Sequence, residues 1–395
     1  MTRDTLLTFN AGSSTVKIGL FRVDDGRPHR IARGVIDLRR APLAFEVERD
    51  GSRLAIGLDA RPDDDLVGIV SQTLAAIAAH LDIGHVAATA HRVVHGGDRF
   101  AGPVRLDDDA IAAIEALTPL APLHQPQCLK LIRAVRGIDP ALPQAASFDT
   151  AFHRTHAPVA TRFALPRALH DEGIRRYGFH GLSYRYIAGA LAERFPQAAA
   201  GKVVAAHLGS GASLCAMDNG VSRDSSMSFT TLDGIPMATR CGAIDPGVLL
   251  HLLGPGGRTL AEAEDLLYHR SGLLGVSGIS ADSRVLLASD RPEAREAIEL
   301  FTFRIAGEIA RLAATLGGLD AMVFTAGIGE NQPAVRAEVC RRLEWLGVTL
   351  DPAANAANRA CISTAASRVG VFVIPTDEEQ VIADEACSVI GEVWA

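Results

Sequence analysis

The sequence lacks the features that define several large classes of protein. Its 395 residues contain no apolar run of about 18 residues, so no membrane-spanning helix is expected. The formal net charge of −7 gives no basic excess, which argues against a nucleic-acid partner. The first residues place Asp4 before only a short apolar run, which is a poor signal peptide and a good first strand.

Cysteine and histidine form no recognisable metal or disulfide motif. The six cysteines are scattered, with no CxxC pair, and this predicts reduced thiols in a cytoplasmic protein. The 13 histidines include no HExxH motif, so no structural zinc site is expected. The chain also lacks the GxxxxGK[ST] run of a P-loop protein and a convincing GxGxxG at the start of a βαβ unit, which lowers the odds of a dinucleotide enzyme.

What is present is the composition of a globular protein, 48% hydrophobic and 22% charged, with length for two or three domains. Residues 203–217 carry a strong local signal. Small apolar residues from Val203 predict a buried strand, and a glycine-rich turn and a second strand follow. Gly209 and Gly211 allow a tight bend that exposes N–H groups, which hold phosphate well. An ordinary hairpin turn is the alternative.

This pattern occurs twice. Shifted by 197 residues, the segment from Leu6 falls on the segment from Val203, and Gly12 and Ser13 meet Gly209 and Ser210. The shared order is an apolar strand, a polar residue, a Gly-Ser turn and a second strand. It predicts two related halves, each beginning with a phosphate-facing hairpin.

Strands and helices are predicted to alternate along the chain, which indicates an α/β protein. The expected strands cover residues 5–10, 16–22, 31–38, 43–48, 53–58, 87–94, 145–149, 321–325 and 370–374, besides the hairpin at 203–217. One helix is expected to start at 63–65 and to run to about residue 81. Further helices are expected at 107–118, in a short segment after 126, at 183–194, 245–253, 260–269 and 292–316, and from about 333. Gly317-Gly318 is a helix C-cap signal, and Thr376–Glu379 reads as a capping box for a final helix.

Four Gly/Ser-rich turns follow predicted strands and together suggest a nucleotide held between two lobes. They are residues 10–15, 207–213 and 326–331 and the region of Gly96 and Gly97. Asp149 ends a predicted strand and Glu378 begins a predicted helix, where hard carboxylate oxygens could hold Mg²⁺ on phosphates. The alternatives are a helix or turn cap for Asp149 and a helix-dipole residue for Glu378.

Two arginines and two histidines complete the candidate set. Arg92 and Arg240 lie near glycines in expected loops, where a planar guanidinium suits a carboxylate or a phosphoryl group. Surface salt bridges are the alternative for both arginines. His124 and His180 lie among apolar, glycine or proline residues, and each could equally be a structural histidine.

The order of motifs carries a resemblance to a known family. The motifs are Asn10–Ser14, His91–Gly97, Ala121–His124, Phe148–His153, Arg175–Gly181, His207–Ser213, Thr239-Arg240, Ile244–Pro246, Phe324–Asn331 and Thr376–Glu379. In these motifs the chain resembles the acetate kinase family of the acetate and sugar kinase/Hsp70/actin superfamily from end to end. Each motif alone is modest evidence, but the full set in this order is specific.

The resemblance implies an α/β fold of two duplicated ribonuclease-H-like domains with ATP in the cleft between them. We expect one domain at residues 1–149 with 381–395 and a nucleotide-carrying domain at 150–380. The implied catalytic residues are Asp149, Arg240, Arg92, His180 and His124, with Asn10 and Glu378 as ligands of Mg²⁺ (or Mn²⁺). The implied acyl-binding residues are Arg92, Val94, Leu123 and Phe179. The implied nucleotide-binding residues are Lys17, His207, Leu208, Gly209, Ser210, Gly211, Asp282, Ser283, Arg284, Gly327, Ile328, Gly329 and Asn331.

The implied reaction is direct, in-line phosphoryl transfer from ATP to acetate, without a phosphoenzyme. The resemblance also implies that the protein is a homodimer. A carboxylate of pKa about 4–5 is already ionised at neutral pH and needs no general base, so the demand is charge neutralisation. Rival functions are a propionate or butyrate kinase, a phosphatase or ATPase of the superfamily, and an Hsp70-like chaperone. The paired arginines argue against the phosphatase or ATPase. Only about 15 residues follow the last motif, which argues against the substrate-binding domain that such a chaperone needs.

The sequence departs from the family at a few positions near the site. Ser210 replaces the usual Asn of the His-Leu-Gly-Asn-Gly motif, so phosphate binding would depend on the backbone of residues 209–211. Thr231 replaces a frequent proline near the acyl pocket, which leaves chain-length preference open. Ala238, Cys241 and Ala243 differ around Arg240, and Leu182 and Tyr184 differ beside His180.

Overall fold

The computed structural model describes residues 4–12, 15–61 and 66–394, and it divides into two compact units. The first unit comprises Met1–Phe152 with Asp377–Ala395, and the second comprises His153–Thr376. The predicted helix start at 63–65 and the serines of the Asn10–Ser14 motif lie outside the described residues. The expected domain bounds, 1–149 with 381–395 and 150–380, stay a prediction.

The first unit contains an eight-stranded sheet in the order β5-β4-β3-β2-β1-β6-β8-β7. Its strands are β1 (Asp4–Ala11), β2 (Thr15–Asp24), β3 (Arg27–Asp37), β4 (Ala44–Arg49), β5 (Ser52–Gly57), β6 (His85–Val93), β7 (Val104–Arg105) and β8 (Gln144–Phe148). β1 pairs antiparallel with β2 and parallel with β6, and β6 pairs parallel with β8. Three parallel neighbours therefore end at one edge of this sheet.

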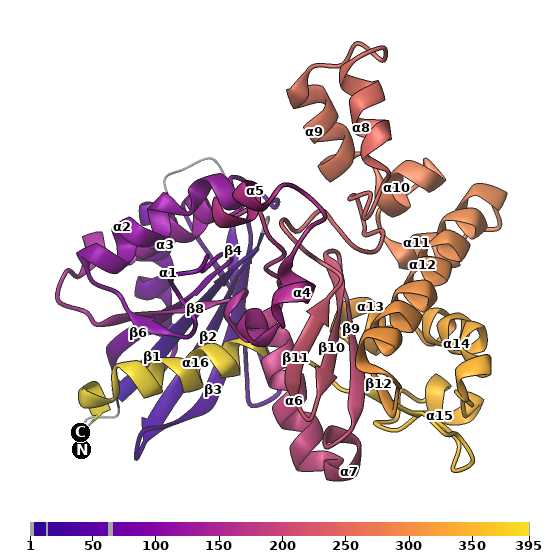
Figure 1. The fold of residues 1–395 in the computed structure, drawn as a ribbon. Helices are drawn as coiled ribbons and strands as arrows, with labels where there is room; N and C mark the ends of the chain where they lie inside the picture. Colours follow the sequence, from indigo (N-terminus) through magenta and orange to yellow (C-terminus); the bar gives the residue numbers. More distant parts are fainter. Residues whose placement is uncertain (1–3, 13–14, 62–65, 395) are drawn as a thin grey trace. The chain divides into compact units, whose positions relative to one another are not determined.

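Alternation along β1 separates the core from the site. Leu7 and Phe9 belong to a hydrophobic cluster with residues of α1 (Leu66–His80) and α3 (Gln125–Ile138). Asn10 has the opposite parity and contacts α16 (Glu378–Val389) through Glu378. Because successive side chains of a strand point to opposite faces, a polar Asn10 can end an apolar strand without entering the core. Figure 1 shows α16 running along the strands of this unit. Helix α2 (Asp108–Ala116) precedes α3.

The second unit repeats the arrangement with a five-stranded sheet, in the order β11-β10-β9-β12-β13. Its strands are β9 (Lys202–Leu208), β10 (Ala212–Asp218), β11 (Val221–Ser225), β12 (Ala321–Thr325) and β13 (Gly370–Val373). β9 pairs antiparallel with β10 and parallel with β12, as β1 does with β2 and β6. When the sequence is shifted by 197 residues, the end of β1 at Ala11 falls on the end of β9 at Leu208, and the start of β2 at Thr15 falls on the start of β10 at Ala212. The predicted internal repeat is confirmed.

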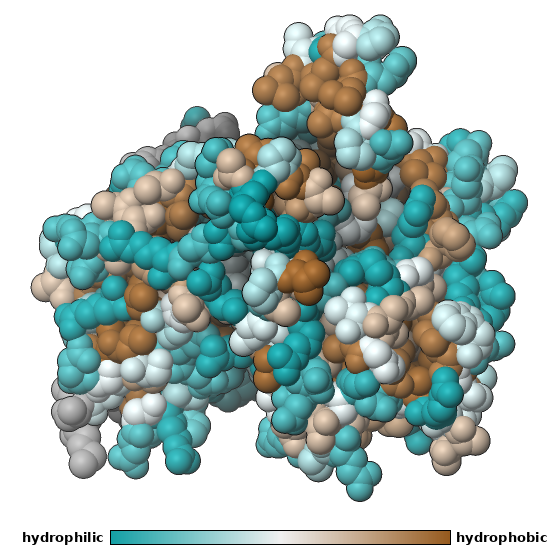
Figure 2. Space-filling view, in the orientation of Figure 1, coloured by the Kyte–Doolittle hydropathy of each residue, from teal (hydrophilic) through white to brown (hydrophobic). Residues whose placement is uncertain are grey.

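The helices of the second unit pack around this sheet or extend from it. They are α4 (Pro158–Thr161), α5 (Arg167–Asp171), α6 (Gly181–Arg194), α7 (Pro196–Ala199), α8 (Pro246–Leu253), α9 (Leu260–His269), α10 (Gly272–Ser277), α11 (Ser283–Leu287), α12 (Pro292–Leu316), α13 (Ala326–Asn331), α14 (Pro333–Arg342) and α15 (Pro352–Ala356). The pair α8–α9 extends away from the sheet of this unit (Figure 1). Hydrophobic residues, brown in Figure 2, lie on the surface of this pair. Within the described residues, no helix is long and apolar enough to cross a membrane.

Several predicted elements need correction. Residues 326–331, expected as a glycine-rich turn, form helix α13. The expected capping box is absent, because Asp377 and not Thr376 is the N-cap of α16 and accepts a hydrogen bond from the Gln380 N–H. The helix after residue 126 spans 14 residues rather than a short segment. The prediction for 292–316 is confirmed, with Gly317 as a left-handed C-cap at φ 68°.

Candidate active site

Four side chains from distant parts of the sequence meet in the first unit. Asn10 is near the end of β1, Arg92 is the penultimate residue of β6, and Asp149 directly follows β8. Glu378 is the first residue of α16. Since β1, β6 and β8 are parallel neighbours, their carboxyl ends present these groups at one edge of the sheet, where α/β proteins place their ligands. Arg92 lies in β6, within the strand expected at 87–94, and not in a loop beside the glycines that follow it.

The four groups form a connected hydrogen-bond network. Arg92 donates from Nε to both Asp149 carboxylate oxygens, at 3.0 and 3.1 Å, and from Nη2 to Oδ2 at 2.5 Å. Its Nη1 donates to Asn10 Oδ1 at 3.2 Å. Asn10 donates in turn from Nδ2 to Glu378 and Glu379, at 2.7 and 2.8 Å. The carboxylate of Asp149 therefore binds the guanidinium of Arg92 through both of its oxygens.

Burial makes this network electrostatically strong. Desolvation opposes the charge of the Arg92 guanidinium, but the Asp149 carboxylate outweighs it and, with Glu378, holds the pKa of Arg92 above its ordinary value. Asn10, Asp149 and Glu378 offer amide and carboxylate oxygens, the hard donors that Mg²⁺ prefers. No group of three or more His, Cys, Asp or Glu side chains in the described part of the chain forms a metal cage.

The second unit contains the predicted phosphate turn, residues 209–211, between β9 and β10. Its three residues are half-buried or exposed, while the flanking strands are buried. The Gly209 N–H donates to the Gly211 carbonyl at 3.2 Å, and the Ser210 carbonyl accepts from the Ala238 N–H. The second bond ties the turn to the loop that carries Arg240.

Two imidazoles and one guanidinium surround this turn. A Cβ atom on Gly211 would lie 3.5 and 3.6 Å from the Arg240 guanidinium nitrogens and 3.7 Å from His180 Nε2. A Cβ on Gly209 would lie 3.7 Å from His207 Nε2. The rings of His180 and His207 stack at 4.3 Å with an interplanar angle of 16°. Cationic or N–H-bearing groups thus converge on the backbone of the turn, as an anion site requires.

The reason for glycine in this turn differs from the expectation. Neither Gly209 nor Gly211 has a positive φ, so no left-handed backbone is needed there. A Cβ on Gly209 would approach the Gly211 carbonyl oxygen to 3.1 Å, and a Cβ on Gly211 would occupy the space before Arg240 and His180. Glycine at 209 therefore avoids a close contact, and glycine at 211 leaves open the space before Arg240 and His180, while neither serves a left-handed backbone.

His180 has an unusual backbone for a non-glycine residue. It is the N-cap of α6 in the left-handed region, with φ 56° and ψ 26°. A non-glycine residue in this region costs of order 1 kcal/mol or more and is found at functional sites. His153 Nε2 donates to the Phe179 carbonyl at 2.9 Å, just before His180. Burial lowers the pKa of His153 to about 3, so His153 is neutral and can accept from Ser222 at its Nδ1.

The residues expected around adenosine form one group in the second unit. Asp282 caps α11 and binds Arg284 through two parallel hydrogen bonds, at 3.0 and 2.6 Å. Ser283 accepts a hydrogen bond from Gln332 at 2.6 Å, which joins α11 to the end of α13. Gly327, Ile328, Gly329 and Asn331 belong to α13, and Asn331 donates to the Gly327 carbonyl at 3.0 Å. Gln332 was not singled out from the sequence.

The remaining predicted residues occupy varied environments. In the first unit, Val94 is buried, Leu123 is 38% exposed, and His124 is the N-cap of α3. Lys17 is exposed and pairs across the hairpin with Asn10. In the second unit, Leu208 and Phe179 are buried.

Sequence reasoning missed Ser183 and Ser213, whose hydroxyls bind Nδ1 of His207 and His180, each at 2.8 Å. The register of the predicted hairpin carried a signal for Ser213, since it pairs with His207.

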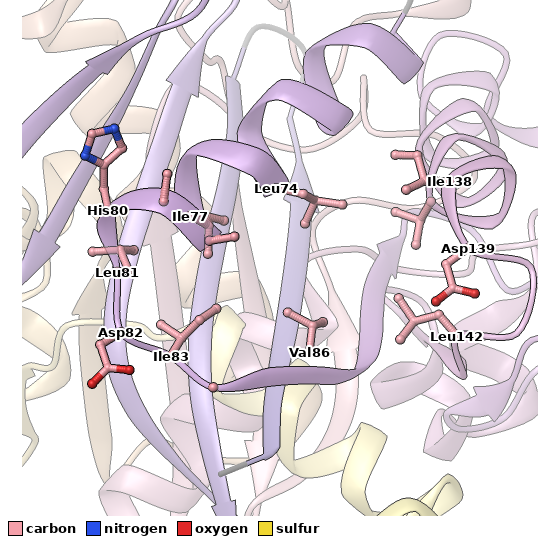
Figure 3. Close-up of a pocket in the computed structure, with 14 residues that line it drawn as sticks. Leu74, Ile77, His80, Leu81, Asp82, Ile83, Val86, Ile138, Asp139 and Leu142 are labelled. Atoms are coloured by element: carbon pink, nitrogen blue, oxygen red, sulfur yellow. The ribbon is translucent and has the colours of Figure 1, made fainter. Parts of the chain in front are cut away.

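Two other features do not join these clusters. The N–H groups of Gly96 and Gly97 donate to the side chains of Thr150 and His95, each at 2.9 Å, so both are already hydrogen-bonded within the first unit and do not form a phosphate nest. A largely apolar pocket of about 780 Å³ lies in the first unit between the C-terminal ends of α1 and α3 (Figure 3). Leu74, Ile77 and Ile138 line it, and no predicted site residue does.

Comparison with known proteins finds similarity over nearly the whole chain. Residues 5–384 match the model of the acetokinase family. The chain is 50% identical over 389 residues to an acetate kinase of Rhodopseudomonas palustris, covering 96% of this chain and 97% of the relative.

Two solved structures share the fold. One is an acetate kinase of Porphyromonas gingivalis, with 34% identity, TM-score 0.86 and coverage of 98% of this chain and 100% of that one. The other is a propionate kinase of Francisella tularensis, with 34% identity, TM-score 0.90 and the same coverage. These similarities and the two clusters lead to one conclusion: the chain belongs to the acetokinase family.

Proposed function

We propose that this chain is an acetate kinase, which transfers the γ-phosphoryl group of ATP reversibly to acetate and yields acetyl phosphate and ADP. One observation carries the proposal most directly. The turn at residues 209–211 has the Arg240 guanidinium and His180 Nε2 within 4 Å of the space next to Gly211. Donors arranged in this way suit the charge that spreads over the equatorial oxygens of a transferring phosphoryl group.

The chemistry of the acceptor fits a site rich in cations. Acetate is ionised at neutral pH, so its oxygen attacks phosphorus without a general base. The new bond joins that oxygen to the γ-phosphorus, while the bond from phosphorus to the bridging oxygen breaks and its electron pair stays on ADP. Two anions must approach each other, and Arg92 and Arg240 would lower that repulsion. The transfer is proposed to be direct, without a phosphoenzyme.

Mg²⁺, or Mn²⁺ in its place, is the proposed cofactor. Asn10 and Glu378 would hold it, with Asp149 beside them, through the oxygen donors described above. When bound, the ion supplies positive charge to the phosphate oxygens. Arg92 already contacts Asn10 and Asp149, so it orders the oxygen donors of the set before any ligand arrives.

ATP is proposed to bind through two groups of residues in the second unit. The backbone of residues 209–211, with His207, would hold phosphate, and the group around Ser283 and α13 would surround adenosine. The Ser283–Gln332 hydrogen bond supports this assignment, because it keeps α11 and α13 together. Lys17 and Leu208 would also contribute to nucleotide binding, and His124 would take part in catalysis.

The acyl group would contact Val94, Leu123 and Phe179. The second candidate function is that of a propionate or butyrate kinase. It is supported by the structural similarity to a propionate kinase of Francisella tularensis, with TM-score 0.90. The backbone carbonyl of Thr231 accepts a hydrogen bond from Arg240 Nη1 at 2.9 Å. A proline at this position could accept the same bond, so the replacement of the frequent proline by Thr231 does not remove this contact with Arg240. One methylene changes binding in an apolar pocket by about 1–3 kcal/mol, so selectivity among short acids should be partial.

A homodimer is also proposed. Helix α8 has apolar side chains and no buried residue. Leu250 of α8 and Leu260 of α9 are 70% and 71% exposed. A second copy that covered this surface would remove apolar area from water, which supports association.

A reducing, cytoplasmic location is proposed as well, supported by six free thiols, of which Cys128, Cys215 and Cys340 are buried.

The deciding experiment traps acyl phosphate with hydroxylamine. The protein is incubated with ATP, Mg²⁺ and acetate, propionate or butyrate, and the hydroxamates are quantified. Acetate is expected to give the highest kcat/KM. Absence of hydroxamate from all three acids rejects the proposal, and a higher kcat/KM with propionate transfers it to the second candidate.

A further inference from the structure

A chain of three hydroxyl- and imidazole-bearing side chains ends on His180. Its Nδ1 lies 2.8 Å from Ser213 Oγ, and Ser213 Oγ lies 2.5 Å from the Tyr184 hydroxyl. Tyr184 and Ser213 are completely buried. Nothing in the proposed mechanism uses either residue, yet burying two hydroxyls in an otherwise apolar interior is costly unless both are hydrogen-bonded.

The sequence brings these three groups together by two local rules. His180 is the N-cap of α6, and Tyr184 in the first turn of that helix donates its backbone N–H to the His180 carbonyl at 3.1 Å, so the two residues are neighbours. Ser213 is the second residue of β10 and pairs with His207 across the hairpin. His207 stacks on His180, so the ring of His180 is fixed by its neighbour in one direction and by Ser213 in the other.

We propose that Tyr184 and Ser213 are positioning residues that hold His180 in one tautomer, with the proton on Nε2. Tyr184 donates to Ser213 Oγ, and Ser213 donates its single proton to His180 Nδ1. Nε2 then carries a hydrogen directed toward the turn at residues 209–211. The inference rests on the proposed function, because it assigns His180 the role of a hydrogen-bond donor to the transferring phosphoryl group.

The direction of the bonds follows from acidity. A phenol with an ordinary pKa near 10 is a far better donor than an aliphatic alcohol, so the short bond runs from Tyr184 to Ser213. A serine hydroxyl has one proton and two lone pairs, so accepting from tyrosine leaves its proton for Nδ1. A neutral imidazole that accepts at Nδ1 must carry its proton on Nε2.

The backbone gives independent support. His180 occupies a left-handed conformation that a non-glycine residue adopts only when its surroundings enforce it. Gly178 also has a positive φ, of 86°, and a Cβ there would lie 2.6 Å from the His153 ring. The segment before His180 is therefore built around close packing, and the Tyr184–Ser213 pair fixes the side chain that this segment presents.

The first test uses Tyr184→Phe in the full chain, with Tyr186→Phe as the matched control. Tyr186 lies on the same helix, is only half-buried, and belongs to no part of the site. Tyr184→Phe is expected to lower kcat about 10- to 100-fold while KM for ATP and acetate changes less than about twofold, as expected when a group that orients another is removed. Tyr186→Phe should retain wild-type kcat. Unchanged kcat in Tyr184→Phe overturns the proposal.

The second test does not depend on turnover. Nitrogen-15 NMR of histidine-labelled protein at pH 8, assigned with His180→Gln, reports which nitrogen of His180 is protonated. The wild type is expected to show an Nε2-protonated ring, and Ser213→Ala to show a mixture of tautomers. An Nδ1-protonated ring in the wild type overturns the inference, even if no variant folds. If the wild type makes no acyl phosphate but shows the Nε2 tautomer, the proposed function fails and the positioning relationship stands.

Discussion

Arg92 binds Asp149 through two of its guanidinium nitrogens, and the two side chains are only 14% and 2% exposed. Residues 57 positions apart in the sequence thus form a buried ion pair at the edge of the first sheet. The pair orients a cation and a carboxylate without leaving either uncompensated. Its removal has consequences for stability as well as for catalysis.

Arg92→Ala should destabilise the protein by about 3–5 kcal/mol, because it leaves the Asp149 carboxylate buried without its cation. Urea unfolding followed by circular dichroism measures this. The double variant Arg92→Ala/Asp149→Asn should recover part of the loss, since no unpaired charge remains. Arg105→Ala is the control, because Arg105 pairs with Glu392 at the surface and should contribute less than about 1 kcal/mol. Equal losses for Arg92 and Arg105 would contradict the argument.

Arg240→Ala should lower kcat by a factor on the order of 10³, by analogy with loss of an arginine finger. The physical reason is loss of positive charge beside Gly211 when the phosphoryl group is in transit. Initial rates of ADP formation measure the effect. Arg291→Ala, at an exposed ion pair with Glu293, is the control and should leave kcat unchanged. Near-wild-type turnover of Arg240→Ala would remove Arg240 from the mechanism.

Gly211→Ala should fold normally but raise KM for ATP or lower kcat at least about tenfold, because a 1 Å displacement of reacting groups is sufficient for such losses. The added Cβ meets only ordinary contacts, of 3.5 Å or more, yet it occupies the space before Arg240 and His180. Ser210→Ala is the matched control. If phosphate binding depends on the backbone of the turn, this substitution should change KM for ATP less than about threefold. The reverse ranking of the two variants would show that the Ser210 hydroxyl is the binding group.

The free energy of unfolding should fall as pH decreases from about 6.5 toward 4. Burial is the largest cause that lowers the pKa of His91, His95 and His156 to about 4 and that of His153 to about 3. Each lowered folded-state pKa means that the unfolded chain binds more protons in this window. Stability is therefore fully present above the unfolded pKa and is lost on acidification. Urea titrations at pH 7.5, 6.0 and 5.0 measure the slope, and a slope of zero would contradict burial of neutral histidines.

Leu250→Asp should convert a dimer to a monomer if the surface of α8 and α9 is the interface. A charge placed in a desolvated apolar contact is costly, whereas the same charge at the free surface is not. Light scattering coupled to size-exclusion chromatography measures the mass. Val159→Asp, at a residue that is 84% exposed outside α8 and α9, is the control and should leave the mass unchanged. A wild-type monomer, or an unaffected dimer in Leu250→Asp, would reject this surface.

Local rules explain the elements that were predicted well. The apolar spacing and the glycine pair at its end delimit α12, because helix periodicity and a left-handed C-cap act within a few residues. The same rules failed at residues 326–331, where glycines suggested a turn but α13 forms. They also failed at Thr376, whose hydroxyl bonds to Ser183 at 2.9 Å while Asp377 caps the helix. A tertiary partner outcompeted a local capping pattern in that case.

The sequence by itself determined the two related hairpins, the family and the residue types from which the site is built. These depend on patterns within a few residues of one another or on motifs in a fixed order. Only the tertiary structure decided that Arg92 binds Asp149 while contacting Asn10, and that Ser213 and Tyr184 meet His180. The order of parallel strands and the return of α16 bring together residues that lie up to 369 positions apart, as Asn10 and Glu379 do. Strand order depends on which packing of the whole sheet buries the most apolar surface, and no local propensity encodes that choice.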